Sequence, residues 1–155
     1  MPSNSSPAEP HGRIVSKVLG LFLREQQLLA LCGVDPATGL EYWRPLGGTI
    51  EFGESSAQAL RREMREELGA EIEALRLLGV IEAHFSFDGR QRHEMLFVYF
   101  ARFADARLES STALIGVEAD GTAIQARWVP LEDARQGRLR LVPEGLLELV
   151  DRTVD

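Results

Sequence analysis

The chain has 155 residues, 45% of them hydrophobic, and a formal net charge of −7. This length and apolar content are typical of one compact domain. The acidic balance argues against a non-specific DNA- or RNA-binding protein, which would present a basic face. A polyanionic small molecule stays open as a ligand, because a bound metal ion would invert the local field.

We do not expect the amino-terminal segment to be a signal peptide. Residues 1–12 are rich in Ser, Pro and Asn and lack the basic start and apolar core of a signal peptide. We therefore expect a disordered lead at 1–12 and one domain over 13–155. Cys32 is the only cysteine, which fits a cytoplasmic protein, and we expect it to be buried in an apolar strand. No apolar run is long enough to span a membrane.

Apolar runs at 14–23 and 27–33 flank a polar break, and this pattern predicts a hairpin-like pair of strands. Turn-forming residues predict a loop at 35–39. Residues 42–44 then predict a short strand that Pro45 ends, after which the chain enters a glycine-containing loop.

The next stretch predicts a helix that begins after Ser55 and ends at Gly69. Ser55 and Gln58 fit a capping box, in which two side chains satisfy the first free amides. Gly69 stands where a left-handed cap is needed. The apolar stripe predicted to face the core consists of Ala57, Leu60, Met64 and Leu68.

The second half of the chain predicts a hairpin followed by shorter elements. Asp88-Gly89 favours a two-residue turn between strands at 75–87 and 91–103, and the second strand is apolar on both faces, as a central strand would be. We expect a polar loop at 104–121. Further elements are predicted as a strand at 124–129, a helical turn at 131–134 and a helix at 143–153. Together they indicate an α/β fold, with a mixed sheet flanked by helices.

Three carboxylates lie close together on the predicted helix. Glu66 and Glu67 are adjacent, and they follow Glu63 by three and four residues, so all three can converge on one site. Like charges at this spacing destabilise a helix, and carboxylate oxygens in this number suit Mg²⁺ or Mn²⁺. A solvated acidic helix face is the alternative. The nearby glycines and Arg62 favour a metal site.

The residues around these glutamates have supporting roles in this interpretation. Gly47, Gly48 and Gly53 allow unusual backbone conformations and close approach to a ligand. A carbonyl of Gly47 or Gly48 could complete the metal shell. Arg62 and Glu54 could pair and orient the metal-binding carboxylates.

The pattern Gly48, Glu54, Arg62-Glu63-Met64, Glu66-Glu67 and Gly69 resembles the Nudix box of the Nudix hydrolases. One position departs, because Ala70 stands where the family has a bulky aliphatic residue. The resemblance implies an α/β/α sandwich and Mg²⁺-dependent hydrolysis of a nucleoside diphosphate linked to another group. It also implies that Glu63, Glu66, Glu67 and the Gly47 carbonyl hold the metal.

The resemblance implies attack of a metal-activated water on phosphorus, assisted by a carboxylate base. Candidates for an acid outside the box are Glu94, Glu118 and Asp120. Glu94 is preferred, because a carboxylate in an apolar strand is costly unless paired or metal-bound. The residues expected to be catalytic are thus Arg62, Glu66, Glu67 and Glu94.

Substrate contacts are expected from Arg44, Phe52, Glu82 and His84. For Glu82 and His84 a half-exposed strand face is the simpler alternative, and His93 fits a strand-end histidine. A nucleoside triphosphate and a nucleotide sugar both remain open as substrates. A catalytically silent Nudix domain that senses a nucleotide or metabolite is the alternative function, but the intact box favours an enzyme. We expect no membrane and no specific nucleic-acid partner, and a homodimer stays open.

Overall fold

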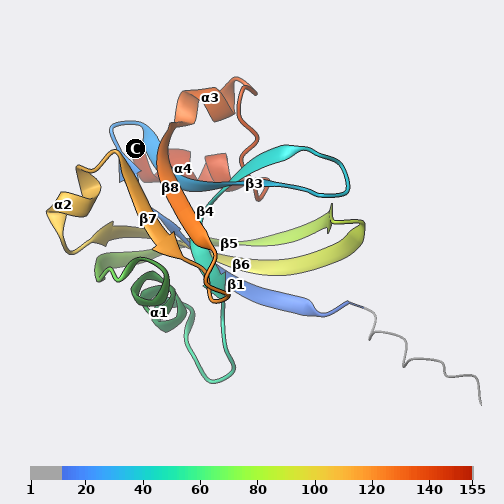
Figure 1. The fold of residues 1–155 in the computed structure, drawn as a ribbon, viewed down its shortest axis with the longest axis horizontal. Helices are drawn as coiled ribbons and strands as arrows, with labels where there is room; N and C mark the ends of the chain where they lie inside the picture. The colour runs from blue at the N-terminus through green and yellow to red at the C-terminus, as the bar shows by residue number, and fades with distance from the viewer. Residues whose placement is uncertain (1–11, 155) are drawn as a thin grey trace, which may run out of the picture.

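The computed structural model describes residues 12–154, so the predicted lead lies outside the described residues except for Gly12. Within them, eight strands form a mixed sheet in the order β5-β6-β1-β4-β3-β8-β7, and β2 pairs with β3 (Figure 1). The strands are β1 (Ile14–Leu21), β2 (Leu23–Arg24), β3 (Gln27–Val34), β4 (Glu41–Thr49), β5 (Ile72–Phe87), β6 (Arg90–Phe103), β7 (Ala113–Val117) and β8 (Ala123–Pro130). The helices are α1 (Ser56–Leu68), α2 (Ala106–Glu109), α3 (Leu131–Arg135) and α4 (Leu146–Val154).

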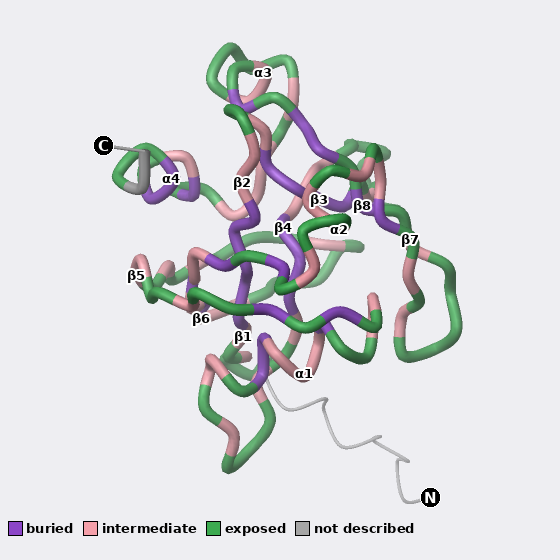
Figure 2. The backbone as a smooth tube through the Cα atoms, turned by 90° about the vertical axis from the view of Figure 1, so that its left-hand side faces the viewer, coloured by how far each residue is buried: buried purple, intermediate pink, exposed green. Residues whose placement is uncertain are grey.

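Helices cover both faces of this sheet, so the predicted α/β fold is confirmed. In Figure 1, α1 lies on one side of the sheet and α3 and α4 on the other. Each side has its own apolar core, one around Leu60 and Met64 of α1 and one around Leu146 and Val150 of α4. In Figure 2 the buried stretches of the backbone lie mainly along the central strands β1, β3 and β4. None of the helices in the described part of the chain is long and apolar enough to cross a membrane.

Helix α1 has the predicted ends. The Ser55 hydroxyl accepts from the Gln58 backbone N–H while the Gln58 side chain accepts from the Ser55 N–H, and Gly69 is left-handed with φ of 63°. Leu60 and Met64 are buried as expected, but Ala57 and Leu68 are only half-buried and Ala59 is buried as well. The capping residues therefore fix where this helix begins and ends.

The expected hairpin of the first two apolar runs is confirmed only next to its turn, and the rest of the first run pairs elsewhere. Strand β1 lies between β6, to which it is parallel, and β4, to which it is antiparallel. Only β2 forms a hairpin with β3, across a turn at Glu25 and Gln26. The second half of β1 is buried on both faces, which is the pattern of a central strand and not of a hairpin edge.

Pro45 does not end β4, which continues through Gly47 and Gly48 to Thr49. The strand pairs with β3 as far as Pro45 and with β1 from Leu46 onward. Pro45, which has no N–H to donate, lies where β4 changes partners, a position at which a strand tolerates proline. The two glycines are therefore strand residues and not loop residues.

The predicted β5–β6 hairpin is confirmed. Asp88 and Gly89 both have positive φ, 51° and 73°, as a two-residue turn of this kind requires. Asp35 anchors this turn from the loop after β3, because its Oδ1 accepts from the Asp88 N–H at 2.9 Å and from the Ala37 N–H at 3.0 Å. Strand β6 lies between β5 and β1, the predicted central position.

Two expectations about the rest of the chain are wrong. The stretch 104–121 is not a plain loop, because it contains α2 and β7, and α1 packs so closely on β7 that a Cβ on Gly116 would lie 2.1 Å from the Glu67 carbonyl oxygen. The last helix begins at Leu146, three residues after Pro143, because Gly145 has φ of 89°, which is incompatible with a helix.

Candidate active site

Arg62, in the middle of α1, is the centre of a polar network that joins this helix to the end of β4 and the loop after it. Its Nε donates to Glu54 Oε2 at 2.8 Å and its Nη2 donates to Glu54 Oε1 at 2.9 Å. Nη2 also donates to the carbonyl oxygen of Thr49 at the end of β4. Arg62 holds the pKa of the Glu54 carboxyl below its usual range, so Glu54 is ionised at neutral pH. This two-pronged pair ties the loop after β4 to the helix.

The same guanidinium reaches two of the clustered glutamates. Nη1 donates to Glu63 Oε1 at 3.1 Å and to Glu66 Oε2 at 3.2 Å. The Glu63 side chain is 14% exposed and that of Glu66 is 58% exposed. The structure thus brings Glu54, Arg62, Glu63 and Glu66 together, and one arginine offsets part of the repulsion among these carboxylates.

Glu67, the third clustered glutamate, lies outside the hydrogen bonds described for Arg62. Burial, the close Glu63 carboxylate and the charge of Glu118 raise the pKa of the Glu67 carboxyl to about 8, and Arg44 only partly offsets them. A carboxyl in this setting is short of positive charge. Glu63 and Glu67 therefore form the part of the cluster that suits a cation.

Two glycines make room for this cluster by close approach. A Cβ on Gly48 would lie 2.3 Å from the Glu63 carboxyl carbon, and one on Gly47 would lie 1.9 Å from the Val18 carbonyl oxygen. Gly53 has a different reason, because its φ is 83° and nothing lies within 4 Å of its missing Cβ. Gly48 thus seats Glu63 against β4, whereas Gly53 shapes the loop.

The cluster opens into a cleft of about 740 Å³ between α1, the ends of β4 and β7, and the β5–β6 hairpin. Cationic side chains line this cleft as well as carboxylates. They are Lys17, Arg44, Arg62, Arg92 and Arg140. A cavity of this size that holds both charges suits a phosphorylated ligand of nucleotide size.

Glu94 lies in this cleft on β6 and pairs with Lys17 of β1. The distance from Lys17 Nζ to Glu94 Oε2 is 2.8 Å, and the Glu94 side chain is only 12% exposed. A buried carboxylate is expected to be paired or metal-bound, and Glu94 is paired with the ammonium group of Lys17. Lys17 was not among the predicted site residues. Its signal was a lone positive charge in one apolar strand, matched by a lone negative charge in another.

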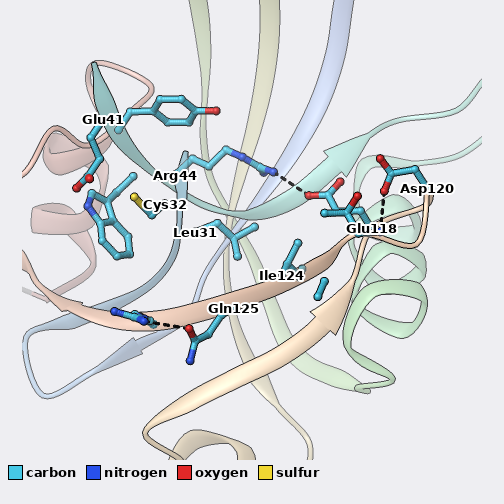
Figure 3. Close-up of a pocket in the computed structure, with 13 residues that line it drawn as sticks. Leu31, Cys32, Glu41, Arg44, Glu118, Asp120, Ile124 and Gln125 are labelled. Atoms are coloured by element: carbon cyan, nitrogen blue, oxygen red, sulfur yellow. Dashed lines mark hydrogen bonds and ion pairs between the residues drawn. The ribbon is translucent and has the colours of Figure 1, made fainter. Parts of the chain in front are cut away.

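The other two candidate acids differ in their positions. Glu118, at the end of β7, lines the cleft and lies 3.6 Å from Arg44 Nη2, as Figure 3 shows. Asp120 lines an adjoining hollow, and its Oδ1 accepts from the Thr122 N–H within its own turn. Glu118 therefore lies beside the three glutamates of α1, Glu63, Glu66 and Glu67, which are called here the acidic cluster. Asp120 instead makes a hydrogen bond within its own turn.

The predicted substrate contacts are only partly brought together. Arg44, Glu82 and His84 line the cleft. Phe52 does not, because it is fully exposed on the loop before α1. Cys32 is also exposed, so the expectation that it is buried is wrong. It lies in the adjoining hollow shown in Figure 3.

Comparisons with known proteins show the family to which the chain belongs. A family model described as the NUDIX domain matches residues 13–150. A Mycobacterium tuberculosis protein, provisionally described as the mutator protein MutT4, is 32% identical over 133 residues, which are 85% of this chain and 50% of that protein. The human 8-oxo-dGDP phosphatase NUDT18 is 32% identical over 125 residues, 81% of this chain and 35% of that protein. The chain thus spans half or less of the length of these two relatives.

Solved structures show the same fold. A MutT NUDIX hydrolase from Burkholderia pseudomallei superposes with a TM-score of 0.56 at 25% identity, covering 77% of this chain and 85% of that one. A NUDIX-family hydrolase from Clostridium perfringens superposes with a TM-score of 0.60 at 18% identity, covering 91% of this chain and 99% of that one. The second likeness concerns the fold alone.

Proposed function

The chain belongs to the NUDIX family, and from this premise we propose that it is a Mg²⁺-dependent pyrophosphohydrolase. Its reaction is cleavage of the diphosphate linkage in a nucleoside diphosphate derivative. One observation carries the proposal: Glu63, Glu66 and Glu67 open on the same cleft as several cationic side chains and two further carboxylates, Glu94 and Glu118. A catalytically silent domain would need no such concentration of acids beside its ligand.

The residues present fit a hard divalent cation. Glu63 and Glu67 lie in contact, and both are half-buried, so their oxygens need a positive partner when both carboxyls are ionised. Glu63, Glu66, Glu67 and the Gly47 carbonyl would hold Mg²⁺, which prefers oxygen ligands. When bound, Mg²⁺ would neutralise charge on the diphosphate and make water more acidic.

The protein's own residues supply the remaining steps. We propose that Arg44 and Lys17, which line the cleft, bind phosphate oxygens, and that the Arg62–Glu54 pair holds the glutamates in position. A cleft carboxylate accepts a proton from water as its oxygen attacks phosphorus, and the bridging P–O bond breaks to release the leaving phosphate group. We assign this role to Glu94, worth roughly 10²- to 10⁴-fold in rate.

Nucleoside di- or triphosphates with a purine base are the substrates we favour. The names of two relatives point this way: the human protein is an 8-oxo-dGDP phosphatase, and a zebrafish protein, 37% identical over 71 residues or 45% of this chain, is an oxidized purine nucleoside triphosphate hydrolase. Nucleotide sugars form the second class to be compared.

A hydrolysis panel tests the proposal. Nucleoside diphosphates and triphosphates, their 8-oxo forms and nucleotide sugars are incubated with the protein and Mg²⁺, and phosphate and pyrophosphate are measured. We expect turnover of at least one class that excess chelator abolishes and added Mg²⁺ restores. Tight nucleotide binding without product in any divalent metal would instead show a sensor, and turnover in excess chelator would exclude the metal mechanism.

A further inference from the structure

The β5–β6 hairpin carries a second group of metal-ligating side chains, formed by Glu82, His84 and His93 and called here the hairpin triad. One ligand atom of each lies within 4.8 Å of those of the other two. The Nε2 atom of His84 is 3.5 Å from Glu82 Oε1, and that of His93 is 3.5 Å from Glu82 Oε2. Two imidazole nitrogens and a carboxylate therefore face one small space.

Strand register brings the triad together. The turn at Asp88-Gly89 places His84 directly opposite His93, and Glu82 is two residues back on the same face of β5. The two imidazole rings stack with centroids 4.0 Å apart. This arrangement is part of the folded hairpin and needs no movement of the backbone.

The hairpin triad and Glu94, the proposed base, lie on opposite faces of the hairpin. Ala83 pairs with Glu94, so Glu94 and its partner Lys17 lie on the other face from His93. Arg92 is also directed to that other face, where its guanidinium lies 5.9 Å from the Phe87 ring. These neighbouring cations are thus directed away from the triad.

The imidazole ring of His93 contains a buried nitrogen whose hydrogen-bonding capacity is not satisfied. Its Nε2 is buried and has no hydrogen-bond partner among the described residues, since the Glu82 oxygen at 3.5 Å is too far for a normal hydrogen bond. A buried polar nitrogen without a partner lowers stability. A metal ion shared with Glu82 and His84 would use its lone pair.

We propose that Glu82, His84 and His93 bind a divalent first-row transition-metal ion, of which Zn²⁺ is the representative. Imidazole nitrogen suits such ions, whereas Mg²⁺ prefers oxygen, so the site is chemically distinct from the acidic cluster of α1. Ligand atoms about 2.1 Å from a tetrahedral zinc ion lie about 3.4 Å apart. Each imidazole nitrogen lies 3.5 Å from one of the two Glu82 oxygens, which is close to this spacing.

The site is open to solvent on one side. The Glu82 and His84 side chains are 57% and 66% exposed, so an ion can enter without opening the core. Three protein ligands leave a fourth position for water or another ligand. A bound ion would cross-link β5 to β6 near the hairpin turn, at the border of the cleft.

Calorimetric titration of the full chain with Zn²⁺, in millimolar Mg²⁺ to occupy the acidic cluster, tests the proposal. We expect one equivalent to bind at the triad. His84→Gln, His93→Gln and Glu82→Gln should each weaken this binding by more than about 100-fold, because even outer-shell partners are worth about 10- to 100-fold. Glu73→Gln, an exposed carboxylate elsewhere on β5, is the matched control and should bind as the wild type does.

A second readout uses the wild-type protein alone, so it holds even if a variant fails to fold. The chain has three histidines, and imidazole ¹⁵N spectra should shift on Zn²⁺ addition for His84 and His93. The proposal is overturned if both spectra stay unchanged. It is also overturned if folded triad variants bind Zn²⁺ like the wild type, or if Glu67→Gln alone removes the binding.

Discussion

The acidic cluster of α1 and the hairpin triad differ in how the protein supports their polar groups. In the cluster, Arg62 stands among the carboxylates and donates to Glu63 and Glu66, so the site carries a permanent counter-charge. The triad has one carboxylate and two imidazoles, and the neighbouring cation Arg92 points away from it. The first site therefore suits a hard cation that also binds phosphate oxygens, and the second suits an ion that prefers nitrogen.

The adjacent residues His93 and Glu94 lie on opposite faces of β6, so a substitution at one should leave the chemistry of the other intact. We expect Glu94→Gln to lower kcat by roughly 10²- to 10⁴-fold, because a general base is worth that much. Zn²⁺ binding at the triad should be unchanged. Steady-state kinetics at saturating Mg²⁺ and nucleotide give kcat, and calorimetry gives the binding.

Glu118→Gln is the comparison for this experiment, because Glu118 also lines the cleft. If Glu94→Gln keeps its full kcat and Glu118→Gln loses it, the general base is Glu118 and not Glu94.

Gly48→Ala tests whether the acidic cluster depends on close approach to β4. The added Cβ would lie 2.3 Å from the Glu63 carboxyl carbon and would push that carboxylate out of position. A misplacement of about 1 Å costs about 100-fold in rate, and we expect a loss of this size. Hydrolysis assays measure it, and circular dichroism shows whether the fold is kept. Wild-type activity in Gly48→Ala would contradict the geometry described for Glu63.

Arg62→Lys tests whether the hydrogen-bond geometry of Arg62, and not only its charge, positions the acidic cluster. Lysine keeps the charge but cannot make the two-pronged bond to Glu54 while it also reaches Glu63 and Glu66. We expect activity to fall by about 10- to 100-fold, as when an outer-shell partner of a metal ligand is lost, with a weaker apparent Mg²⁺ affinity. If the Mg²⁺ dependence of the rate is unchanged, Arg62 does not position the cluster.

Asp35→Asn tests the anchoring of the hairpin and has the smallest expected effect. The Asp88 N–H, and after it the Ala37 N–H, lower the pKa of the Asp35 carboxyl in the folded protein. Its stabilising effect is therefore full above the usual carboxyl pKa of about 4 and is lost as the pH falls through the lowered folded value. Urea denaturation should show Asp35→Asn less stable at pH 7 and level with the wild type in acid. A difference that persists in acid would exclude this cause.

The acidic cluster could be predicted from the sequence because its parts are local. Glu63, Glu66 and Glu67 share one helical turn, and the capping residues mark where that helix begins and ends. The glycine loop was placed too early, because Gly47 and Gly48 are strand residues whose small size matters for packing.

The parts that were missed depend on pairing between distant segments. Hydrophobic pattern does not say which strand lies beside β1, so the Lys17–Glu94 pair was not foreseen. The sequence alone indicates an ordinary strand-end histidine at His93, because its relation to Glu82 depends on cross-strand register. Strand β7 is not predicted, although its five residues are apolar or glycine, because so short a run within a polar stretch carries little signal.

In the proposed mechanism, Glu67 helps to hold a metal ion on which hydrolysis depends. The most direct test measures Mn²⁺ binding by electron paramagnetic resonance and nucleotide hydrolysis in the same samples of wild type and Glu67→Gln. We predict that the variant binds Mn²⁺ more weakly and loses at least about 100-fold in rate, because the substitution removes a charged oxygen ligand and keeps the shape. Undiminished hydrolysis in Glu67→Gln would contradict the claim.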